Sequence, residues 1–239
     1  MRKILSALVI VLMLIPLNAF AADKSEVMTV ILVRHGETDY NRQRRFQGLK
    51  DMPLNETGIN QARLLAERLN DVQIDVFISS PMKRALATTK AVADLHGMAI
   101  AYTDERLVEL NYGDWAGEYK ADIAERYPKM HYTWKNKPHK MKFPNGETLK
   151  QLQTRYRAAL DEAAAKYPGK TIFIGAHSKG NMALMCDLFD VGLDHFYSFP
   201  QDNTCINVLK YEGGKWHVVL INSVDHLGYI YEGEHKRAA

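Results

Sequence analysis

The sequence predicts an α/β fold: a three-layer α/β/α sandwich in which helices cover both faces of a mainly parallel central sheet. Short, β-branched segments with almost no charge alternate along the chain with stretches in which apolar residues recur at helical spacing. This alternation is typical of parallel strands joined by helices, because each crossover returns along a face of the sheet. No internal repeat or linker divides the 239 residues, so we expect one domain.

The first predicted elements are buried strands. They are short and apolar on both faces, as strands inside a parallel sheet must be, and they span residues 27–33, 74–78 and 171–176. Two later segments, residues 205–211 and 215–221, flank Glu212-Gly213-Gly214 and are predicted to form a β-hairpin.

Amphipathic helices are predicted between and after these strands. Their apolar residues fall three or four positions apart and form three sets: Ala62, Leu65, Ala66 and Leu69; Ala85, Thr88, Val92 and Leu95; Leu149, Leu152, Tyr156 and Leu160. Asn55 is a suitable N-cap for the first helix, and Pro168-Gly169 ends the third. Residues 117–145 are predicted to form an irregular cap beside the core, because Lys, His, Pro and aromatic residues are frequent there.

The N-terminus has the pattern of a secretory signal peptide. Two basic residues precede an uncharged apolar run over residues 4–17, and the small residues Ala19 and Ala21 precede a cleavage point at Ala22. The run is shorter than the about 20 apolar residues that a membrane-spanning helix needs. We therefore predict that the protein is exported and is periplasmic or secreted.

Cleavage of the signal peptide, residues 1–21, would leave residues 22–239 as the domain, with no stable membrane association. Two basic residues would be lost, so the formal net charge falls from +3 to 3 − 2 = +1, and no overall basic field remains to attract nucleic acid. Cys186 and Cys205 would meet an oxidising compartment, where a disulfide and two separately buried thiols are both open. The oligomeric state is not indicated by any pattern in the sequence.

Charged and titratable side chains follow all three parallel strands. Arg34 and His35 come directly after the first strand. Arg84 lies shortly after the second, and His177 directly follows the third. Because ligands bind at the carboxyl edge of such sheets, we expect these side chains to meet in one crevice. Guanidinium groups match phosphate oxygens and a neutral imidazole can attack phosphorus, so the pattern predicts phosphoryl transfer with either histidine as nucleophile.

Phosphoryl transfer from an alkoxide leaving group also needs a proton donor, ideally a carboxyl group whose pKa is raised by partial burial. Glu109 is the leading candidate, because residues 113–117 just after it contain glycines and a tryptophan that predict a tight turn lining a pocket. Glu105 and Asp114 remain open as alternatives on the pattern alone.

These residues belong to a series of motifs that resembles the histidine phosphatase superfamily, phosphoglycerate mutase-like branch (branch 1). The motifs occur in the family's order over essentially the whole mature chain. They are Arg34-His35-Gly36-Glu37-Thr38 with Asn41; Phe46-Gln47-Gly48; Asp51-Met52-Pro53-Leu54 with Gly58 and Gln61-Ala62; Ser79-Ser80-Pro81 with Arg84-Ala85 and Thr88; residues 107–117; Pro144-Asn145-Gly146-Glu147-Thr148; and His177. The resemblance implies a phosphoglycerate mutase-like fold.

The resemblance also implies a catalytic role for each core residue. His35 would become the phosphohistidine, and Glu109 would protonate the leaving oxygen and then activate water. Three residues would hold the phosphoryl group: Arg34, Arg84 and His177. The family's reaction requires no metal and no cofactor, and the substrate would be a small-molecule phosphomonoester.

Further residues are expected around the substrate. The resemblance places Asn41, Gln47 and Gly48 near the phosphate or its leaving group. Ser178 departs from the pattern of many relatives, which have glycine after the second histidine. It would open a helix whose free amide groups favour anions, and it could donate to phosphate through its amide or hydroxyl. The next residue, Lys179, is expected to face solvent.

Metal binding and nucleic-acid binding fit the residues less well. No short ligand spacing such as H-E-x-x-H occurs, and two arginines beside the histidines disfavour a bound cation, so we expect no metal. The basic and aromatic stretch over residues 127–143 suits a substrate-covering cap or a solvated loop better than a platform for stacking bases.

Three functions remain open: an exported phosphatase, phosphoglycerate mutase-type phosphoryl transfer, and a catalytically silent phosphate-binding module. Mutases of the family carry a longer insertion with paired arginines, whereas residues 117–144 are a shorter segment with a single arginine, Arg126. All five core residues are present, which weighs against a silent module. We therefore expect a metal-independent histidine phosphatase that hydrolyses phosphoric monoesters.

Overall fold

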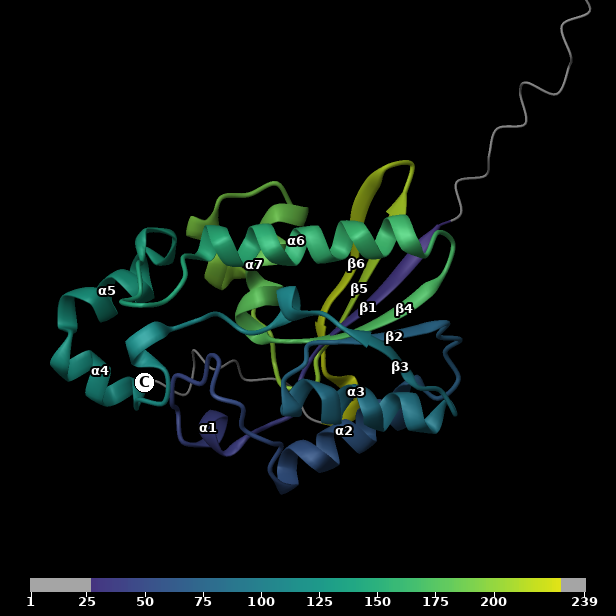
Figure 1. Cartoon of the computed structure of the whole chain (residues 1–239), viewed down its shortest axis with the longest axis horizontal. Helices are drawn as coiled ribbons and strands as arrows, with labels where there is room; N and C mark the ends of the chain where they lie inside the picture. Colours follow the sequence, from purple (N-terminus) through teal and green to yellow (C-terminus); the bar gives the residue numbers. More distant parts are fainter. Residues whose placement is uncertain (1–26, 229–239) are drawn as a thin grey trace, which may run out of the picture.

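The computed structural model describes residues 27–228 and contains a mixed six-stranded sheet between two layers of helices (Figure 1). The strand order is β3-β2-β4-β1-β5-β6. The strands are β1 (Met28–Arg34), β2 (Val76–Ser79), β3 (Ile100–Thr103), β4 (Thr171–Ala176), β5 (Ile206–Glu212) and β6 (Lys215–Ser223). β3, β2, β4 and β1 pair in parallel, and the predicted hairpin adds β5 and β6 antiparallel to β1. The α/β sandwich with a mainly parallel sheet is confirmed.

The α-helices of residues 27–228 are α1 (Asp39–Arg42), α2 (Glu56–Leu69), α3 (Lys83–Leu95), α4 (Lys120–Arg126), α5 (Pro128–Asn136), α6 (Leu149–Lys166) and α7 (Ser178–Leu188). The amphipathic helices that the sequence predicted, α2, α3 and α6, begin and end close to the expected signals. Asn55 caps α2, since its side chain accepts a hydrogen bond from the Gly58 N–H at 2.9 Å. α6 ends at Lys166, just before the predicted stop at Pro168-Gly169.

The two helical layers cover opposite faces of the sheet (Figure 1). Met28, Val30 and Leu32 of β1 belong to the hydrophobic cluster that includes α6 and α7. The alternate residues Ile31 and Val33 belong to the cluster on the face of α2 and α3. Both clusters are buried, so β1 is fixed from two sides and its carboxyl end is held firmly.

The strand register brings the ends of β1, β2 and β4 to one level. Arg34 pairs with Ala176, and Ser79 pairs with Gly175. The ladder continues one residue further, because the His35 N–H donates to the Ala176 carbonyl at 3.1 Å and the Ser80 N–H donates to the Gly175 carbonyl at 2.8 Å. The residues that follow these three strands therefore start from the same edge of the sheet.

The cap differs from its prediction as an irregular segment. Within residues 117–145 the chain forms α4, α5 and the 3-10 turn η4 (Pro138–Lys140). Pro128 begins α5, where its missing N–H costs no hydrogen bond. Trp134 of α5 is buried against Tyr112 and Phe143, and these contacts stabilise a helix too short to show clear periodicity.

The strand β3 was not predicted from the sequence. It lies at the edge of the sheet and alternates between half-buried and exposed residues, so it lacks the continuous apolar run of β1 and β4. Its neighbour β2 covers its inner edge, with Phe77 paired to Ile100. A short edge strand needs little apolar surface, which is why composition alone missed it.

The remaining predictions about the chain ends and the cysteines have different outcomes. Cys186 and Cys205 are both buried free thiols in the structure, which is the second of the two arrangements left open. The proposed signal peptide, residues 1–21, lies outside the described residues. Between residues 27 and 228, no helix is both long and apolar enough to cross a membrane.

Candidate active site

His35 stands directly after β1 and is almost completely buried. Its Nδ1 lies 2.7 Å from the Gly36 carbonyl oxygen. A carbonyl can only accept, so Nδ1 carries the hydrogen and the lone pair of the neutral ring is on Nε2. Burial, together with the charges of Arg84 and Arg34, holds the pKa of His35 well below its ordinary value of 6.5. The ring is therefore a neutral imidazole at neutral pH, as a nucleophile requires.

Arg84 brings a fixed positive charge to the same place. It is fully buried at the start of α3, and its Nη1 and Nη2 donate to the carbonyl oxygens of Lys50 and Gly48, both at 2.9 Å. Burial lowers the pKa of Arg84 to about 10, with Glu109 opposing the shift. The guanidinium therefore remains protonated at neutral pH and is oriented by main-chain acceptors.

Gln47 and Gly48 both accept hydrogen bonds from the Arg84 guanidinium. With its amide oxygen facing the guanidinium, Gln47 accepts from Arg84 Nη1 at 2.9 Å while its nitrogen donates to Thr38 Oγ1 at 2.5 Å. Gly48 has φ +52°, a conformation that favours glycine, and an added Cβ would lie 3.0 Å from the Leu110 carbonyl oxygen. These contacts indicate that Gln47 and Gly48 orient Arg84. Their effect on the predicted phosphate site is therefore exerted through Arg84.

Arg34 and His177 complete the group. Arg34 Nη1 donates to the Gln201 carbonyl at 2.6 Å. The rings of His177 and His35 have centroids 5.1 Å apart, and His177 Nε2 lies 2.8 Å from Ser80 Oγ. Burial, with nearby cations, keeps the pKa of His177 well below 6.5. Its Nδ1 is buried without a hydrogen-bond partner among the described residues, a need that a phosphoryl oxygen would satisfy.

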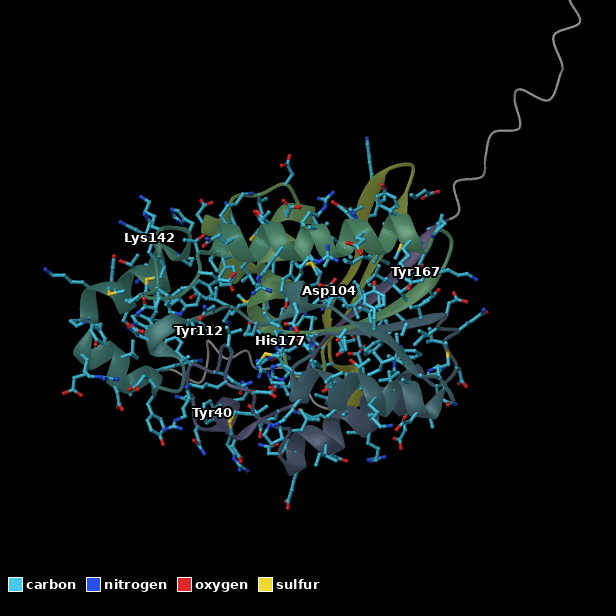
Figure 2. All side chains as sticks on the ribbon, in the orientation of Figure 1. Tyr40, Asp104, Tyr112, Lys142, Tyr167 and His177 are labelled. Atoms are coloured by element: carbon cyan, nitrogen blue, oxygen red, sulfur yellow. The ribbon has the colours of Figure 1, made fainter. Side chains whose placement is uncertain are left out.

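Four residues from three strand ends thus meet, and we call them the strand-end cluster: Arg34, His35, Arg84 and His177. Figure 2 shows His177 between the two helical layers, with Tyr40 and Tyr112 on the side of α4 and α5 in this view. The sequence predicted this convergence from the positions of the residues after their strands. The roles of the individual residues stay predictions, which the geometry makes specific.

The carboxyl group of Glu109 is buried and lies against the N-terminus of α7. Its Oε1 accepts from the Leu110 N–H at 2.8 Å, and the Lys179 N–H lies 3.1 Å from Oε1 and 3.3 Å from Oε2. The free amides of α7 were expected to favour an anion, and in the structure the Lys179 amide donates to the carboxyl group of Glu109. The two other candidate acids, Glu105 and Asp114, are exposed, so Glu109 is the acid that the geometry favours.

Ser178 and Lys179 differ in part from expectation. Ser178 opens α7 as predicted, but its hydroxyl contacts Met182 Sδ at 3.7 Å and Lys179 Nζ at 3.4 Å. Lys179 is half-buried and not fully solvent-facing, because its amide binds Glu109 and its side chain packs along α7. The predicted donation from Ser178 to phosphate would therefore fall to its amide, or to its hydroxyl after a change of rotamer.

Asn41 lies beside the main chain of His35. Its Oδ1 accepts from the Thr38 N–H at 3.2 Å, which completes a capping box at α1, and from Asn203 Nδ2 at 3.4 Å. Asn203 also donates to the His35 carbonyl at 3.0 Å. Asn203 therefore links Asn41 to the main chain of His35, and a contact of Asn41 with the phosphate stays a prediction.

Several contacts of the cluster were not predicted. Ser80 belongs to a recognised motif, yet nothing in the sequence indicated that its hydroxyl would meet His177. Gln201 and Asn203 lie in the loop before β5, and their polar character was the only available signal. Their roles arise from tertiary contacts between distant segments. Within residues 27–228, no group of three or more His, Cys, Asp or Glu side chains is arranged to hold a metal.

Many known proteins are similar to this chain, and three of them are representative. The chain is 34% identical over 210 residues to "Phosphoserine phosphatase 1" of Hydrogenobacter thermophilus, covering 88% of this chain and 99% of that protein. It is 36% identical over 160 residues to "Probable phosphoglycerate mutase GpmB" of Yersinia pestis, covering 67% and 73%. The solved structure of Bacillus stearothermophilus YhfR superposes with a TM-score of 0.80 at 33% identity, covering 84% of this chain and 99% of that one.

A model of one protein family matches most of the chain and identifies its family. It is described as the histidine phosphatase superfamily (branch 1), and it matches residues 30–224. The match begins in β1 and ends just after β6, so it includes every strand of the sheet and every member of the strand-end cluster. The chain therefore belongs to branch 1 of the histidine phosphatase superfamily.

Proposed function

We propose that this histidine phosphatase hydrolyses small-molecule phosphomonoesters through a covalent phosphohistidine on His35, with Glu109 as the proton donor. The observation that carries the proposal is the hydrogen bond between His35 Nδ1 and the Gly36 carbonyl at 2.7 Å, because it leaves the lone pair on Nε2. The relative named phosphoserine phosphatase supports a small alkyl phosphate as the substrate class.

In the first step the Nε2 lone pair of His35 would attack phosphorus, and the bond from phosphorus to the ester oxygen would break. Arg34, Arg84 and His177 would stabilise the charge on the three phosphoryl oxygens. Glu109 would give its proton to the leaving oxygen, so that a neutral alcohol departs. Oε2 of Glu109 makes only the longer contact with the Lys179 N–H, so we expect this oxygen to exchange the proton.

In the second step water would attack the phosphohistidine. The Glu109 carboxylate would take a proton from the water, and the bond between phosphorus and Nε2 would break to release inorganic phosphate. His35 returns to the neutral ring with its hydrogen on Nδ1, bonded to Gly36 throughout. The cycle balances without a metal or a cofactor.

Hydrolysis is favoured over mutase-type transfer by the cap. Arg126 is engaged in an ion pair with Glu118 and lies over the Tyr127 ring, with its guanidinium carbon 5.7 Å from the ring centroid. No second arginine stands next to it in the sequence. An arginine pair that could grip the second anionic group of a phosphoglycerate is therefore missing from this part of the chain.

Export is proposed on the sequence pattern of residues 1–21. Expression in a Gram-negative host should give a periplasmic protein with the mass of residues 22–239 and an N-terminal sequence that begins at Ala22. Replacing Ala21 by a bulky residue such as Phe should block cleavage. Recovery of the full-length wild type and of the full-length Ala21 variant from the cytoplasm would contradict export.

The enzymatic proposal is tested with the purified protein in the presence of EDTA, using p-nitrophenyl phosphate and O-phosphoserine. Inorganic phosphate should be released, and His35→Ala should lower kcat by at least about three orders of magnitude. His195→Ala serves as the control, because that side chain is 59% exposed on η5 (Leu193–Ser198). Rapid quenching should trap an acid-labile phosphoryl group on His35. Unchanged phosphate release by His35→Ala would contradict the nucleophile.

A further inference from the structure

The backbone segment that carries Glu109 is held by side chains of α6. Residues 106–109 lie in and after the 3-10 turn η2 (Glu105–Leu107) and form no strand ladder. The Arg155 guanidinium donates to three of their carbonyl oxygens, at 2.6, 2.6 and 3.0 Å, and the Tyr156 hydroxyl donates to the fourth at 2.7 Å. The acceptors in chain order are Arg106, Leu107, Val108 and Glu109.

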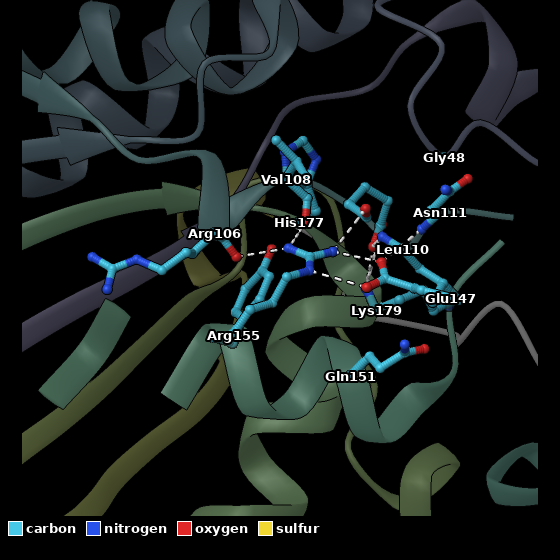
Figure 3. Close-up of polar contacts among 12 residues, drawn as sticks. Gly48, Arg106, Val108, Leu110, Asn111, Glu147, Gln151, Arg155, His177 and Lys179 are labelled. Carbon is cyan, nitrogen blue, oxygen red and sulfur yellow. Dashed lines mark hydrogen bonds and ion pairs between the residues drawn. The ribbon is translucent and has the colours of Figure 1, made fainter. Parts of the chain in front are cut away.

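Glu147 fixes the direction of the Arg155 guanidinium. Its Oε1 lies 2.7 Å from Nη2 and its Oε2 lies 3.1 Å from Nε, a forked pairing that a lysine cannot reproduce. Glu147 also accepts from the Asn111 N–H at 2.8 Å and donates its own N–H to the Asn111 carbonyl at 3.0 Å. Figure 3 shows this network between α6 and the segment on either side of Leu110.

The network lies where solvent competes little. The side chains of Arg155 and Glu147 are only 20% and 16% exposed. Removing the guanidinium would leave three carbonyl groups without their partner, and unsatisfied buried acceptors are costly enough to move a loop. The Glu109 carboxylate would then lose its alignment with the N–H of Lys179 at the start of α7, two residues after His177.

We propose that Arg155, oriented by Glu147, is a positioning residue that sets the Glu109 carboxyl group against the leaving oxygen. The inference rests on the proposed function, because it assumes that Glu109 is the proton donor. Arg155 acts through the main chain of Glu109, so we assign it no contact with the substrate. Its importance should therefore follow how strongly the leaving group needs a proton.

The experiment compares two esters that differ in this need. p-Nitrophenolate leaves readily without a proton, whereas the alkoxide of O-phosphoserine does not. Arg155→Met should lower kcat/KM for O-phosphoserine about 10²-fold, the scale of a catalytic group displaced by about 1 Å, and should lower kcat/KM for p-nitrophenyl phosphate less than about fivefold. The readout is the ratio of kcat/KM for O-phosphoserine to kcat/KM for p-nitrophenyl phosphate. This parameter is chosen because kcat/KM reports phosphoryl transfer to His35 and not the later hydrolysis.

Three variants make the result specific. Glu147→Gln should shift the ratio in the same direction, and Arg155→Lys should restore only part of it, since an ammonium group cannot bind several carbonyls and a carboxylate in fixed geometry. Arg157→Met is the matched control on the same helix. Its guanidinium binds Asp161 and Asp187 away from Glu109, so its ratio should equal that of the wild type.

Glu109→Gln separates the possible failures. If it lowers the ratio and the Arg155 and Glu147 variants do not, the positioning role is wrong and the proposed function stands. If Glu109→Gln affects both esters equally, Glu109 is not the donor and the positioning role falls with it. Near-ultraviolet circular dichroism checks the fold of each variant, and Glu147→Gln and Arg155→Lys keep the test decisive if Arg155→Met does not fold.

Discussion

The chemistry of single residues here depends on which ring nitrogen carries a hydrogen. For His35 the main chain decides, because the Gly36 carbonyl accepts from Nδ1. For His177 a side chain is involved, because Ser80 Oγ lies 2.8 Å from Nε2. A sequence can place a histidine at a strand end, but it does not show which group will meet each nitrogen. The Ser80 contact was therefore not predictable, although Ser80 stands in a motif.

Replacing Ser80 by alanine should weaken the phosphate site. His177 is fully buried, and loss of the hydroxyl would leave neither ring nitrogen with a protein partner among the described residues. One such hydrogen bond corresponds to about 1 kcal/mol, so kcat/KM should fall roughly fivefold, with a similar rise in the inhibition constant for vanadate. Ser79→Ala is the control, because Ser79 Oγ donates to the Ser80 carbonyl and does not touch His177. Equal effects of the two variants would contradict this role.

The acid limb of the pH profile should report the low pKa of His35. Burial and the charges of Arg84 and Arg34 disfavour the imidazolium, so the nucleophile stays neutral as the pH falls below 6.5. Arg34→Gln removes one cation, which should raise the pKa of His35 and move the acid limb of kcat/KM to higher pH. The shift is measured separately from the overall loss of rate. A limb that stays in place would show that another group controls it.

At the scale of elements, the sequence predicts best what rests on long apolar patterns. β1, β4, α2 and α6 were placed within a few residues, because each buries a regular series of side chains. α4 and α5 were missed, since seven and nine residues span too few turns to show a period. The contact between α6 and α7 is a further feature of tertiary structure, because Gly180 lies directly against the Tyr156 ring.

Gly180→Ala should disturb this helix contact. An added Cβ would lie 1.8 Å from the Tyr156 ring, and Tyr156 is fully buried, so neither helix can yield without cost. We expect a loss of about 1–3 kcal/mol in the free energy of unfolding, measured by urea denaturation. Gly192→Ala is the control, because its Cβ would come closest to the exposed Asp194 side chain, which can rotate away. A similar loss in both variants would contradict the packing argument.

At the scale of the whole molecule, the strand order explains why the strand-end cluster was predictable. β1, β4 and β2 are neighbours in the sheet, so residues that directly follow them must meet. The supports of the cluster come from other places: Arg155 from the middle of α6, and Gln201 from the loop before β5. Arg155 reaches residues 106–109 from the face of its helix, and Gln201 contacts Arg34 from its loop, so no local sequence pattern indicates either contact. The convergence of the cluster residues was thus predictable from their positions after the strands, and the contacts that support them were not.

The stability of the whole fold should depend on pH through the two buried histidines. His35 and His177 both have a pKa well below 6.5 in the folded protein, chiefly because burial disfavours the charged ring. Between that lowered pKa and 6.5 the unfolded chain binds a proton and the folded protein does not, so stability is full above 6.5 and falls as the pH drops below it. Each histidine should therefore lower the free energy of unfolding as the pH is reduced from about 7.5 to about 5.5.

The measurement is urea unfolding at these two pH values in buffer without phosphate, since a bound anion would stabilise the folded state. His177→Gln removes one of the two groups, so its loss of stability on acidification should be clearly smaller than that of the wild type. His195→Gln changes an exposed ring and should leave the wild-type difference unaltered. If His177→Gln loses as much stability as the wild type, the ring of His177 is already protonated in the folded protein, and a neutral His177 beside Ser80 is ruled out.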